Sequence, residues 1–423
     1  MRQYFNMKSF LMPIGVMIMG VMCTQNIVAQ HQTSSPYSMF GVGVVNPGGD
    51  VISSAMGGVG IALPSQTRIN TLNPASLSAI DSLTFLMDAQ LVGFKSEYGT
   101  SSATQQTSDA NFDAISFAFR VKPWWGCAFG MNSYSQTGYE FNTSSYILGS
   151  MSTYQTVYQG SGGLTRFNFS NGFRLFNGLS VGIDASYIWG QLVATETGDF
   201  TSISGESMIN ERTYHLNNFH LSGGLQYQLA LGNNNRLFLG AVANTKTRLA
   251  TGYNQAITGS GGTEYVNKDN RANDYELPAG WGAGMALNYH RSWTFAVDYR
   301  FSKWSDVVNT MRYAKYTDSY GLNGGVEFAP QKNSYQSILN RMKYRAGAFY
   351  RDTYLKIKDN DIIERGFSLG LSVPLRQSKN AINIAYEYKL LGTHNNGLIK
   401  EQVNTIKLGL LLSENWFYKS KFE

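Results

Sequence analysis

The sequence predicts an all-β fold, a transmembrane antiparallel β-barrel of about 14 strands with an N-terminal plug in its lumen. Two observations predict the barrel: segments in which apolar and polar residues alternate, and connections between them that tend to alternate between short and long. A Gly- and Ser-rich segment ahead of the first strand predicts the plug. With 26 Tyr, 24 Phe and only 15% charged residues, the composition suits a wall between lipid and water.

The alternation is clearest in "AINIAYEYKLLG", residues 381–392. Successive strand side chains point to opposite faces, so one face of this strand is apolar. That face carries Ile382, Ile384, Tyr386, Tyr388 and Leu390. The segments 114–121, 179–190, 292–301 and 405–413 alternate in the same way. A soluble β-sandwich also alternates, but charges in mid-strand and aromatics near the strand ends favour lipid outside and water inside.

Turn spacing is the second signal. Short connections are expected at 122–123, 176–178, 232–235, 290–291 and 376–379, and these should face the periplasm. Longer connections, expected to be loops and mostly outside, fall at 142–162, 195–211 and 250–278. The connection at 329–340 departs from this rule and is expected to contain a helical turn. The strands are expected at 83–96, 110–121, 124–141, 163–175, 179–194, 212–230, 236–249, 279–289, 292–304, 319–328, 341–353, 362–374, 380–391 and 403–415.

The N-terminus predicts export. Arg2 and Lys8 precede an apolar run of about 13 residues, which is short for a membrane span, and small residues follow it. We therefore expect a signal peptide over 1–29, a plug over 30–81 and the barrel over 82–423. Cys23 raises a lipoprotein alternative, which the bulky Met22 before it disfavours. Removal of two cations lowers the net charge from +6 to +4, and no basic run indicates nucleic acid.

The plug segment supplies apolar surface that the polar inner faces of the strands lack. A hydrophobic solute needs such surface, because burial of apolar area drives its binding. Pro74 is expected to start a short helix with Asn73 as its cap. The candidate substrate contacts in the plug are Tyr37, Met39, Phe40, Ile61, Leu63 and Leu72.

Two stretches of the plug, "AMGGVGIALPSQ" at 55–66 and "INTLNPASLSAID" at 69–81, resemble the N-terminal hatch of the FadL/TodX family of outer-membrane transporters. The Asn-Pro-Ala signature of that family maps onto Asn73, Pro74 and Ala75. "SPYSMFGVG" at 35–43 and "ENWFYKSKFE" at 414–423 are similar to members from the Bacteroidetes. The resemblance covers essentially the whole mature chain and implies a fourteen-strand barrel in the outer membrane.

The resemblance also implies a function. Hydrophobic small molecules, fatty-acid-like or aromatic, would enter from outside, bind in apolar pockets and leave sideways through the wall. In this family the opening accompanies a kink in the third strand. Gly126, Gly130 and Gly138 are the candidates here, since glycine permits a bulge, although each could equally make room for neighbouring aromatics. The ligand-contacting side chains of characterised members are not identifiable, so the substrate is not transferable.

A second function stays open. The same architecture occurs in accessory barrels of secretion or assembly machines, including the type IX shuttle barrel, which bind protein partners. An extended apolar groove under the hatch would favour transport, and a large flat loop surface would favour the accessory role. Outer-membrane lipid and lipopolysaccharide are expected partners in either case, and the chain is expected to be monomeric apart from accessory proteins.

No constellation of residues indicates an enzyme, a metal site or a cofactor. His215 and His220 are separated by an odd number of residues, so a regular strand points them to opposite faces. His290 is expected in a solvated turn. A nucleophile and base paired by the fold would leave no signal in sequence spacing. The mid-strand charges are interpreted as solvated or paired wall residues; these are Asp184, Asp298, Arg300, Glu387 and Lys389.

Overall fold

The computed structural model describes residues 35–100, 103–147, 149, 152–199, 206–272, 275–308, 314–330, 337–375 and 379–415. All of them belong to one compact unit, residues 32–423. The expected signal peptide and residues 30–34 of the expected plug lie outside the described residues. Among the described residues, no helix has the length and apolar character needed to cross a membrane.

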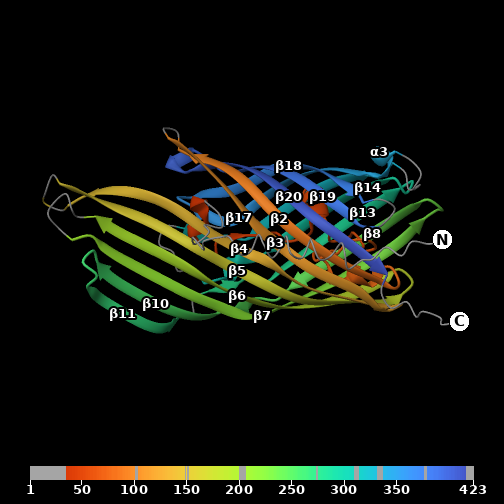
Figure 1. Cartoon of the computed structure of the whole chain (residues 1–423), viewed down its shortest axis with the longest axis horizontal. Coiled ribbons are helices and arrows are strands. Elements are labelled where there is room, and N and C mark those ends of the chain that lie inside the picture. Colours follow the sequence, from red (N-terminus) through yellow and green to blue (C-terminus); the bar gives the residue numbers. More distant parts are fainter. Residues whose placement is uncertain are drawn as a thin grey trace, which may run out of the picture. The chain divides into compact units, whose positions relative to one another are not determined.

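The core of the fold is a closed antiparallel barrel of 14 strands, which confirms the predicted fold class (Figure 1). Each barrel strand pairs with the next along the chain, and the last strand pairs with the first from Thr84–Asn415 to Gly99–Lys400, which closes the ring. The barrel strands are β2 Thr84–Gly99, β3 Thr104–Lys122, β4 Trp125–Tyr146, β5 Thr153–Phe176, β6 Leu179–Asp199, β7 Met208–Leu231, β8 Asn235–Asn244, β13 Gly280–Tyr289, β14 Trp293–Ser302, β16 Ser319–Phe328, β17 Lys343–Ile357, β18 Asn360–Pro374, β19 Ala381–Gly392 and β20 Lys400–Asn415.

The two faces of the wall follow the predicted alternation. In β19 and β20, Ile382, Ile406 and Leu408 are exposed on the outside, whereas Asn383 and Ala385 are buried on the inside. His220 is buried and hydrogen-bonds Thr247, while His215 is exposed, so these two histidines do point to opposite faces. The outward apolar residues form the surface expected to face lipid.

Four neighbouring strands are the longest of the barrel. β4, β5, β6 and β7 have 22, 24, 21 and 24 residues, whereas β13, β14 and β16 have 10 each. A membrane crossing takes about 9–11 residues. The hairpin of β10 (Ala250–Gly259) and β11 (Glu264–Ala272) adds to this sheet, because β10 pairs with β7 over its whole length. We call this part the strand extension; it lies at the left in Figure 1.

The strand extension corrects the expected loops at 142–162, 195–211 and 250–278. Most of these residues are in strands, and the described connection between β4 and β5 begins only after Tyr146. Richness in Ser, Thr, Asn and Gly predicts loops for these segments, but Thr has high β propensity and neighbouring strands pair with them. Small accessory strands complete this end: β9 Thr247–Arg248 pairs with β12 Glu276–Leu277, and β15 Ala314–Tyr316 pairs with β17.

Tight turns occur at both ends of the barrel, which corrects the expected alternation of turn lengths. His290 and Arg291 have φ of 49° and 59°, as a two-residue hairpin turn of the primed type requires. Lys358 and Asp359 form a similar turn, with φ of 48° and 61°, at the opposite end of the strands. The helical turn expected within 329–340 is α3, Ile338–Arg341. Residues 376–378 of an expected turn lie outside the described residues. Two further short helices are η4 Trp304–Asp306 and η5 Asn395–Gly397.

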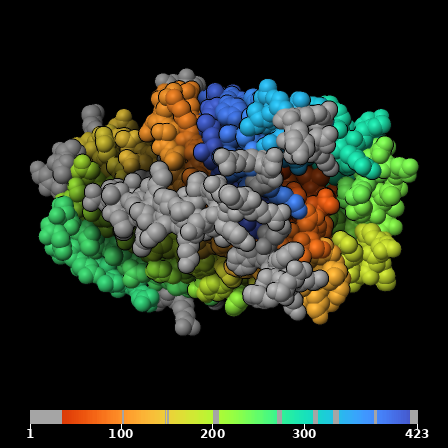
Figure 2. All heavy atoms as spheres, turned by 45° about the vertical axis from the view of Figure 1, so that its right-hand side comes forward, coloured from red at the N-terminus to blue at the C-terminus, as the bar shows by residue number. Residues whose placement is uncertain are grey.

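Residues 35–83, which we call the hatch, precede the first barrel strand. Their elements are η1 Pro36–Met39, β1 Val44–Val45, α2 Val51–Ser54 and η2 Pro74–Ala79. In Figure 2 their red to orange atoms lie between the blue C-terminal strands and the green strands. The expected helix after Asn73 is confirmed as a 3₁₀ helix. The Asn73 side chain accepts a hydrogen bond from the backbone N–H of Ala75 at 3.0 Å.

Candidate functional site

A ring of glycines on the inner wall receives the hatch. A Cβ atom added at any of these glycines would lie within 3.0 Å of a hatch atom, for example 2.1 Å from Asn73 Oδ1 at Gly224 and 2.2 Å from the Gly57 nitrogen at Gly347. The wall and the hatch backbone are therefore in direct contact, which only glycine allows. The ring consists of Gly126, Gly172, Gly182, Gly224, Gly240, Gly284, Gly325, Gly347, Gly370 and Gly409, one from each of β4, β5, β6, β7, β8, β13, β16, β17, β18 and β20.

Charged wall residues hold the backbone of the hatch. One carboxylate oxygen of Asp298 accepts hydrogen bonds from the N–H groups of Gly60 and Ile61, at 2.7 and 2.9 Å. The Arg300 guanidinium donates to the carbonyls of Pro47 and Gly58, at 3.0 and 2.9 Å. The two side chains also form an ion pair with each other at 3.9 Å, and this pair and the hydrogen bonds to the hatch offset the cost of taking the ions out of water. Asp298 and Arg300 were interpreted as solvated or paired wall residues, and the structure places them on the hatch.

Three more arginines repeat this arrangement around the wall. Arg351 donates to the carbonyl of Gly57, Arg174 to that of Ser78 and Arg120 to that of Ile80, at distances of 3.1 to 3.2 Å. Each supplies a hydrogen-bond donor to a carbonyl at or beyond a helix end: Gly57 follows α2, Ser78 lies in the last turn of η2, and Ile80 is the C-cap of η2. The hatch is thus bonded to β3, β5, β14 and β17 as well as to the glycine ring.

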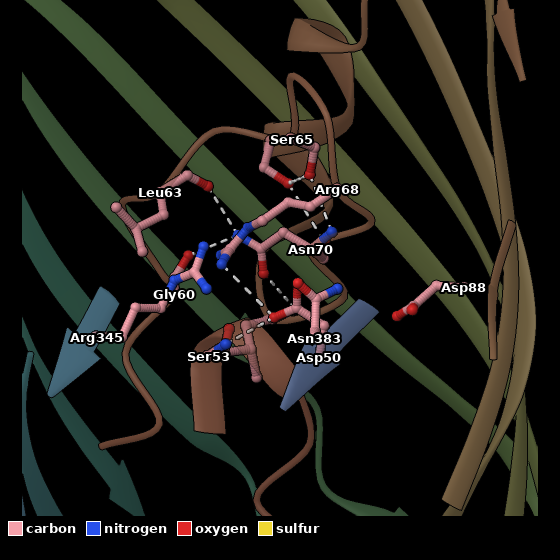
Figure 3. Close-up of polar contacts among 12 residues, drawn as sticks. Asp50, Ser53, Gly60, Leu63, Ser65, Arg68, Asn70, Asp88, Arg345 and Asn383 are labelled. Carbon is pink, nitrogen blue, oxygen red and sulfur yellow. Dashed lines mark hydrogen bonds and ion pairs between the residues drawn. The ribbon is translucent and has the colours of Figure 1, made fainter. Parts of the chain in front are cut away.

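The hatch also has its own internal network (Figure 3). The amide of Asn70 donates to the carbonyls of Gly60 and Leu63, each at 2.7 Å, and so ties two arms of the loop together. The hydroxyl of Ser65 accepts the Asn70 N–H at 3.0 Å. In Figure 3, Arg68 extends toward Asp50, the N-cap of α2, with which it forms a buried ion pair at 3.6 Å. These contacts hold a segment with little regular structure in one conformation.

The Asn-Pro-Ala triplet lies where the hatch touches β6 and β7. Asn73 is fully buried; besides capping η2 it donates to the carbonyls of Ile61 and Leu225, at 2.7 and 3.0 Å. Pro74 and Ala75 lie against the glycines of β5 and β6, where any side chain on the wall would collide with their backbone. In this structure the triplet is a packing and anchoring element.

A cavity of about 530 Å³ lies beside the hatch. Of the expected hatch contacts, Tyr37, Ile61 and Leu72 line it, whereas Met39, Phe40 and Leu63 do not. Phe40 packs at the edge of the main buried cluster and Leu63 belongs to another cluster, near Phe238. Pro74 of the hatch motif also lines it, and apolar lining residues that the sequence did not single out include Val44, Val45, Val92, Phe94, Val242, Trp281 and Leu355.

Tyr37 is anchored rather than open to the cavity. It is buried, and its hydroxyl donates a hydrogen bond to the backbone carbonyl of Ile399. Burial, and then the nearby Glu401 carboxylate, raise the pKa of Tyr37 well above its usual value. The neighbouring Ser35 hydroxyl donates to Glu401 at 2.7 Å, so the start of the hatch is fixed to β20.

Ion pairs form much of the remaining cavity lining. Lys407 pairs with Asp113 at 3.1 Å, and Lys389 pairs with Glu364 at 3.4 Å. Arg351 also contacts Glu364. Lys389 was expected to be a paired wall residue, and this is confirmed. The cavity lining therefore combines apolar side chains from the hatch, β2 and other strands with ion pairs from β3 and β17 to β20.

The ladder between β3 and β4 ends early. Its last pair toward the strand extension is Ala114–Asn132, and β4 then bulges at Tyr134, between Ser133 and Ser135. Beyond that point the hatch takes the place of β3: Val44 pairs with Gln136 and Val45 with Ser135. Tyr134, Val44 and Val45 also line the cavity, so the cavity reaches the gap between the strands.

The candidate glycines of this strand lie apart from the bulge. Gly126 and Gly130 are within the paired ladder, opposite Arg120 and Ser116. Gly126 belongs to the glycine ring under the hatch. Gly138 lies beyond the bulge, where its carbonyl accepts hydrogen bonds from the N–H of Ser35 and the hydroxyl of Ser38, both at 2.9 Å. The bulge at Tyr134 lies between Gly130 and Gly138, at a position that no glycine marks in the sequence.

Solved structures with a similar fold include hydrocarbon channels and toluene transporters. The chain is similar to the CymD monoaromatic hydrocarbon channel, with a TM-score of 0.60 and 16% identity over 90% of this chain and 100% of that one. The Pseudomonas putida toluene transporter TodX gives a TM-score of 0.61 with 17% identity, over 89% of this chain and 100% of that one. A Pseudomonas aeruginosa FadL homologue gives 0.58 with 11% identity, over 88% and 99%. At these identities the likeness concerns the fold.

A search of the curated proteins finds none that matches this chain. A family model described as BamG matches residues 10–423, which is nearly the whole sequence. The resemblance to the FadL/TodX family therefore holds for the architecture, with its barrel and N-terminal segment. By its sequence, the chain belongs to the BamG family.

Proposed function

We propose that this chain is an outer-membrane barrel that serves as an accessory subunit of a secretion or assembly machine and binds protein partners through its strand extension. The observation that carries this proposal is the length of β4 to β7. Their 21 to 24 residues exceed a membrane crossing by about 10 to 15 residues, or very roughly 40 Å of sheet. Lipid does not require this sheet, and a partner would use it.

The hatch supports the same function. Direct backbone contact with the glycine ring, and hydrogen bonds from Asp298 and Arg300, fix the hatch to the wall beneath the cavity. An extended apolar groove under the hatch would have favoured transport, but the wall there packs tightly against Val51, Met56 and Leu77. Membership of the BamG family supports this proposal, while the likeness to the hydrocarbon channels, at 16% identity for CymD, concerns the fold.

The test is depletion of the chain in its own cell. Loss should lower the amounts of other outer-membrane or secreted proteins, while uptake of toluene or a long-chain fatty acid is unchanged. A variant in which residues 250–272 are replaced by a short Gly-Ser turn should fold, judged by the heat-modifiable migration typical of barrels, and should reproduce the depletion defect. Loss of uptake with normal levels of the other proteins would contradict the proposal.

Uptake of a hydrophobic small molecule is the second candidate, and one observation favours it. The cavity reaches the β3–β4 gap and carries Val44, Val45, Val92 and Phe94 on its apolar side. A ligand there would gain roughly 25 cal/mol for each Å² of apolar surface removed from water, and the gap would be its sideways route. Saturable binding of a fluorescent fatty acid by the purified chain, lost when Val45 is replaced by Trp, would support this candidate.

A further inference from the structure

We propose that the gap-facing edge of β4, residues Glu140–Tyr146, accepts an extended segment of a partner protein as an added β-strand. This inference rests on the proposed accessory function and names the contact through which a partner is held. The occupant is a peptide backbone in extended conformation, antiparallel to β4. Strand addition of this kind derives its affinity from main-chain hydrogen bonds along an exposed sheet edge.

The hatch already uses the inner part of this edge in the same way. The N–H of Asn46 donates to the carbonyl of Tyr134, and the N–H of Ser35 donates to the carbonyl of Gly138, both at 2.9 Å. Between them, Val44 pairs with Gln136 in antiparallel register. The backbone groups of 134, 136 and 138 thus face the gap. Because alternate residues of a strand point their backbone groups to the same side, those of 140, 142 and 144 face it too.

No other strand takes this position in the part of the chain that the structure describes. β3 leaves β4 at the Ala114–Asn132 pair and continues with β2 alone. β5 pairs with β4 on the opposite side up to Tyr146–Thr153. The edge from Glu140 to Tyr146 therefore continues directly from a strand-pairing surface that the hatch occupies. Seven residues of strand offer roughly 23 Å for pairing.

The side chains of this edge indicate a peptide rather than a lipid. Below the bulge, the outward-facing Met131 is apolar and exposed, as suits contact with lipid. Above it, the outward residues Glu140, Asn142 and Ser144 are polar and exposed to solvent. Tyr146, at the tip, is the exposed large apolar side chain of this edge. From Glu140 to Ser144 a lipid chain would find little apolar surface, whereas amide and hydroxyl side chains are compatible with a second strand. The edge thus lies outside the apolar band of the wall.

The other free edge of the same sheet is protected, and this one is not. β11 forms that second edge and carries Glu264, Lys268 and Asp269 within six residues. Charges on an edge strand oppose pairing with another chain. Residues 139–146 of β4, "YEFNTSSY", contain a single charge, no proline and four Tyr, Phe or Thr residues that favour strands. Protection of the β11 edge but not of the β4 edge is expected if the β4 edge has a partner.

The experiment measures hydrogen exchange at single amides of β4 by mass spectrometry, in native outer membranes and in the purified full-length chain. The amides of Asn142 and Ser144 should exchange at least about tenfold more slowly in the membranes. The amides of Phe141 and Thr143, which face β5, should not differ between the two samples. Asn142→Pro removes the gap-facing N–H without touching the β5 ladder and should abolish both the partner complex and the protection of Ser144. Asn142→Thr keeps the N–H and should retain both.

The alternatives give different outcomes, and each overturns the inference. Equal exchange in both samples means that no strand is added. Protection restored by phosphatidylethanolamine vesicles alone assigns the edge to lipid. Protection that the purified chain shows, and that a deletion of residues 30–34 removes, assigns it to the N-terminal segment of the chain. If a partner complex survives Asn142→Pro, the docking edge is wrong while the accessory function stands; if no complex exists in native membranes, both are wrong.

Discussion

The glycine ring and the β3–β4 gap, on two sides of the hatch, differ in whether their backbone N–H and C=O groups are hydrogen-bonded within the chain. At the glycine ring, wall and hatch touch directly, and side chains such as Asp298, Arg300 and Asn73 bond the hatch backbone. At the gap beyond Gly138, the edge of β4 extends into solvent, and the N–H and C=O groups of its alternate residues face the gap. Buried backbone groups must be paired, whereas exposed groups can remain with water until a partner arrives. The backbone groups at the glycine ring are therefore already paired within the chain, whereas those at the β4 edge remain available to a partner.

The largest effect is expected at the ring itself. Gly224→Val should prevent the hatch from seating, because even a Cβ at this position would lie 2.1 Å from Asn73 Oδ1. We expect little or no heat-modifiable barrel. Gly223, the next residue, faces outward, and a Cβ there would meet only a carbonyl at 3.7 Å, so Gly223→Val is the matched control and should assemble. Normal assembly of both variants would show that the contact is not needed.

The next effect concerns the carboxylate that holds the hatch. Asp298→Ala leaves the N–H groups of Gly60 and Ile61 without their acceptor and Arg300 without its nearby opposite charge, and should lower the free energy of unfolding by roughly 3 kcal/mol. Asp298→Asn keeps an acceptor oxygen and should lose less. Urea unfolding in detergent micelles measures the difference. Limited proteolysis should cleave the hatch faster in Asp298→Ala than in Asp298→Asn.

A smaller loss is expected at the cap of η2. Asn73→Ala removes one accepted and two donated hydrogen bonds and should cost about 2 kcal/mol. Barrel assembly should remain intact, so the variant loosens the hatch without removing it. A lower unfolding midpoint and faster cleavage of residues 55–72 are the expected readouts. An unchanged unfolding midpoint would show that Asn73 does not anchor the hatch.

The cavity tests whether the region between the two sides has a ligand. Val45→Trp fills part of the lining and should weaken binding of a fluorescent fatty acid about tenfold, if such binding occurs. The control is Ile406→Trp, on the lipid-facing side of β20. Partner association should be the same in both variants, because the docking edge lies beyond the bulge. If Val45→Trp alone loses the partner, the cavity lining contributes to partner binding.

The smallest effect is expected at the protected edge. The double replacement Lys268→Thr and Asp269→Thr removes two charges from β11 and makes it resemble β4. The barrel should fold normally, and a modest increase in self-association should appear in analytical ultracentrifugation of the purified protein. If the increase is absent, charge is not what distinguishes the two edges.

The sequence determined the features that depend on local periodicity. Alternation with a period of two sets which side chains face outward, and this correctly predicted the wall, its fourteen strands and the opposite faces of His215 and His220. The Asn-Pro pair predicted the cap and the start of η2, because both act on the backbone within two residues. The helical turn near Ile338 was predicted on similar local grounds.

Only the tertiary structure decided which of these faces meet. Closing the ring brings Gly57 against Gly347 and Asn73 against Gly224, contacts between residues far apart in the chain that no local pattern encodes. The same holds for the hatch strand that replaces β3 next to β4 after Asn132. The strand extension was missed because Ser- and Thr-rich segments are neutral alone and become strands when a neighbouring strand supplies the hydrogen bonds. Sequence sets the direction of each side chain, and closure of the barrel sets its partner.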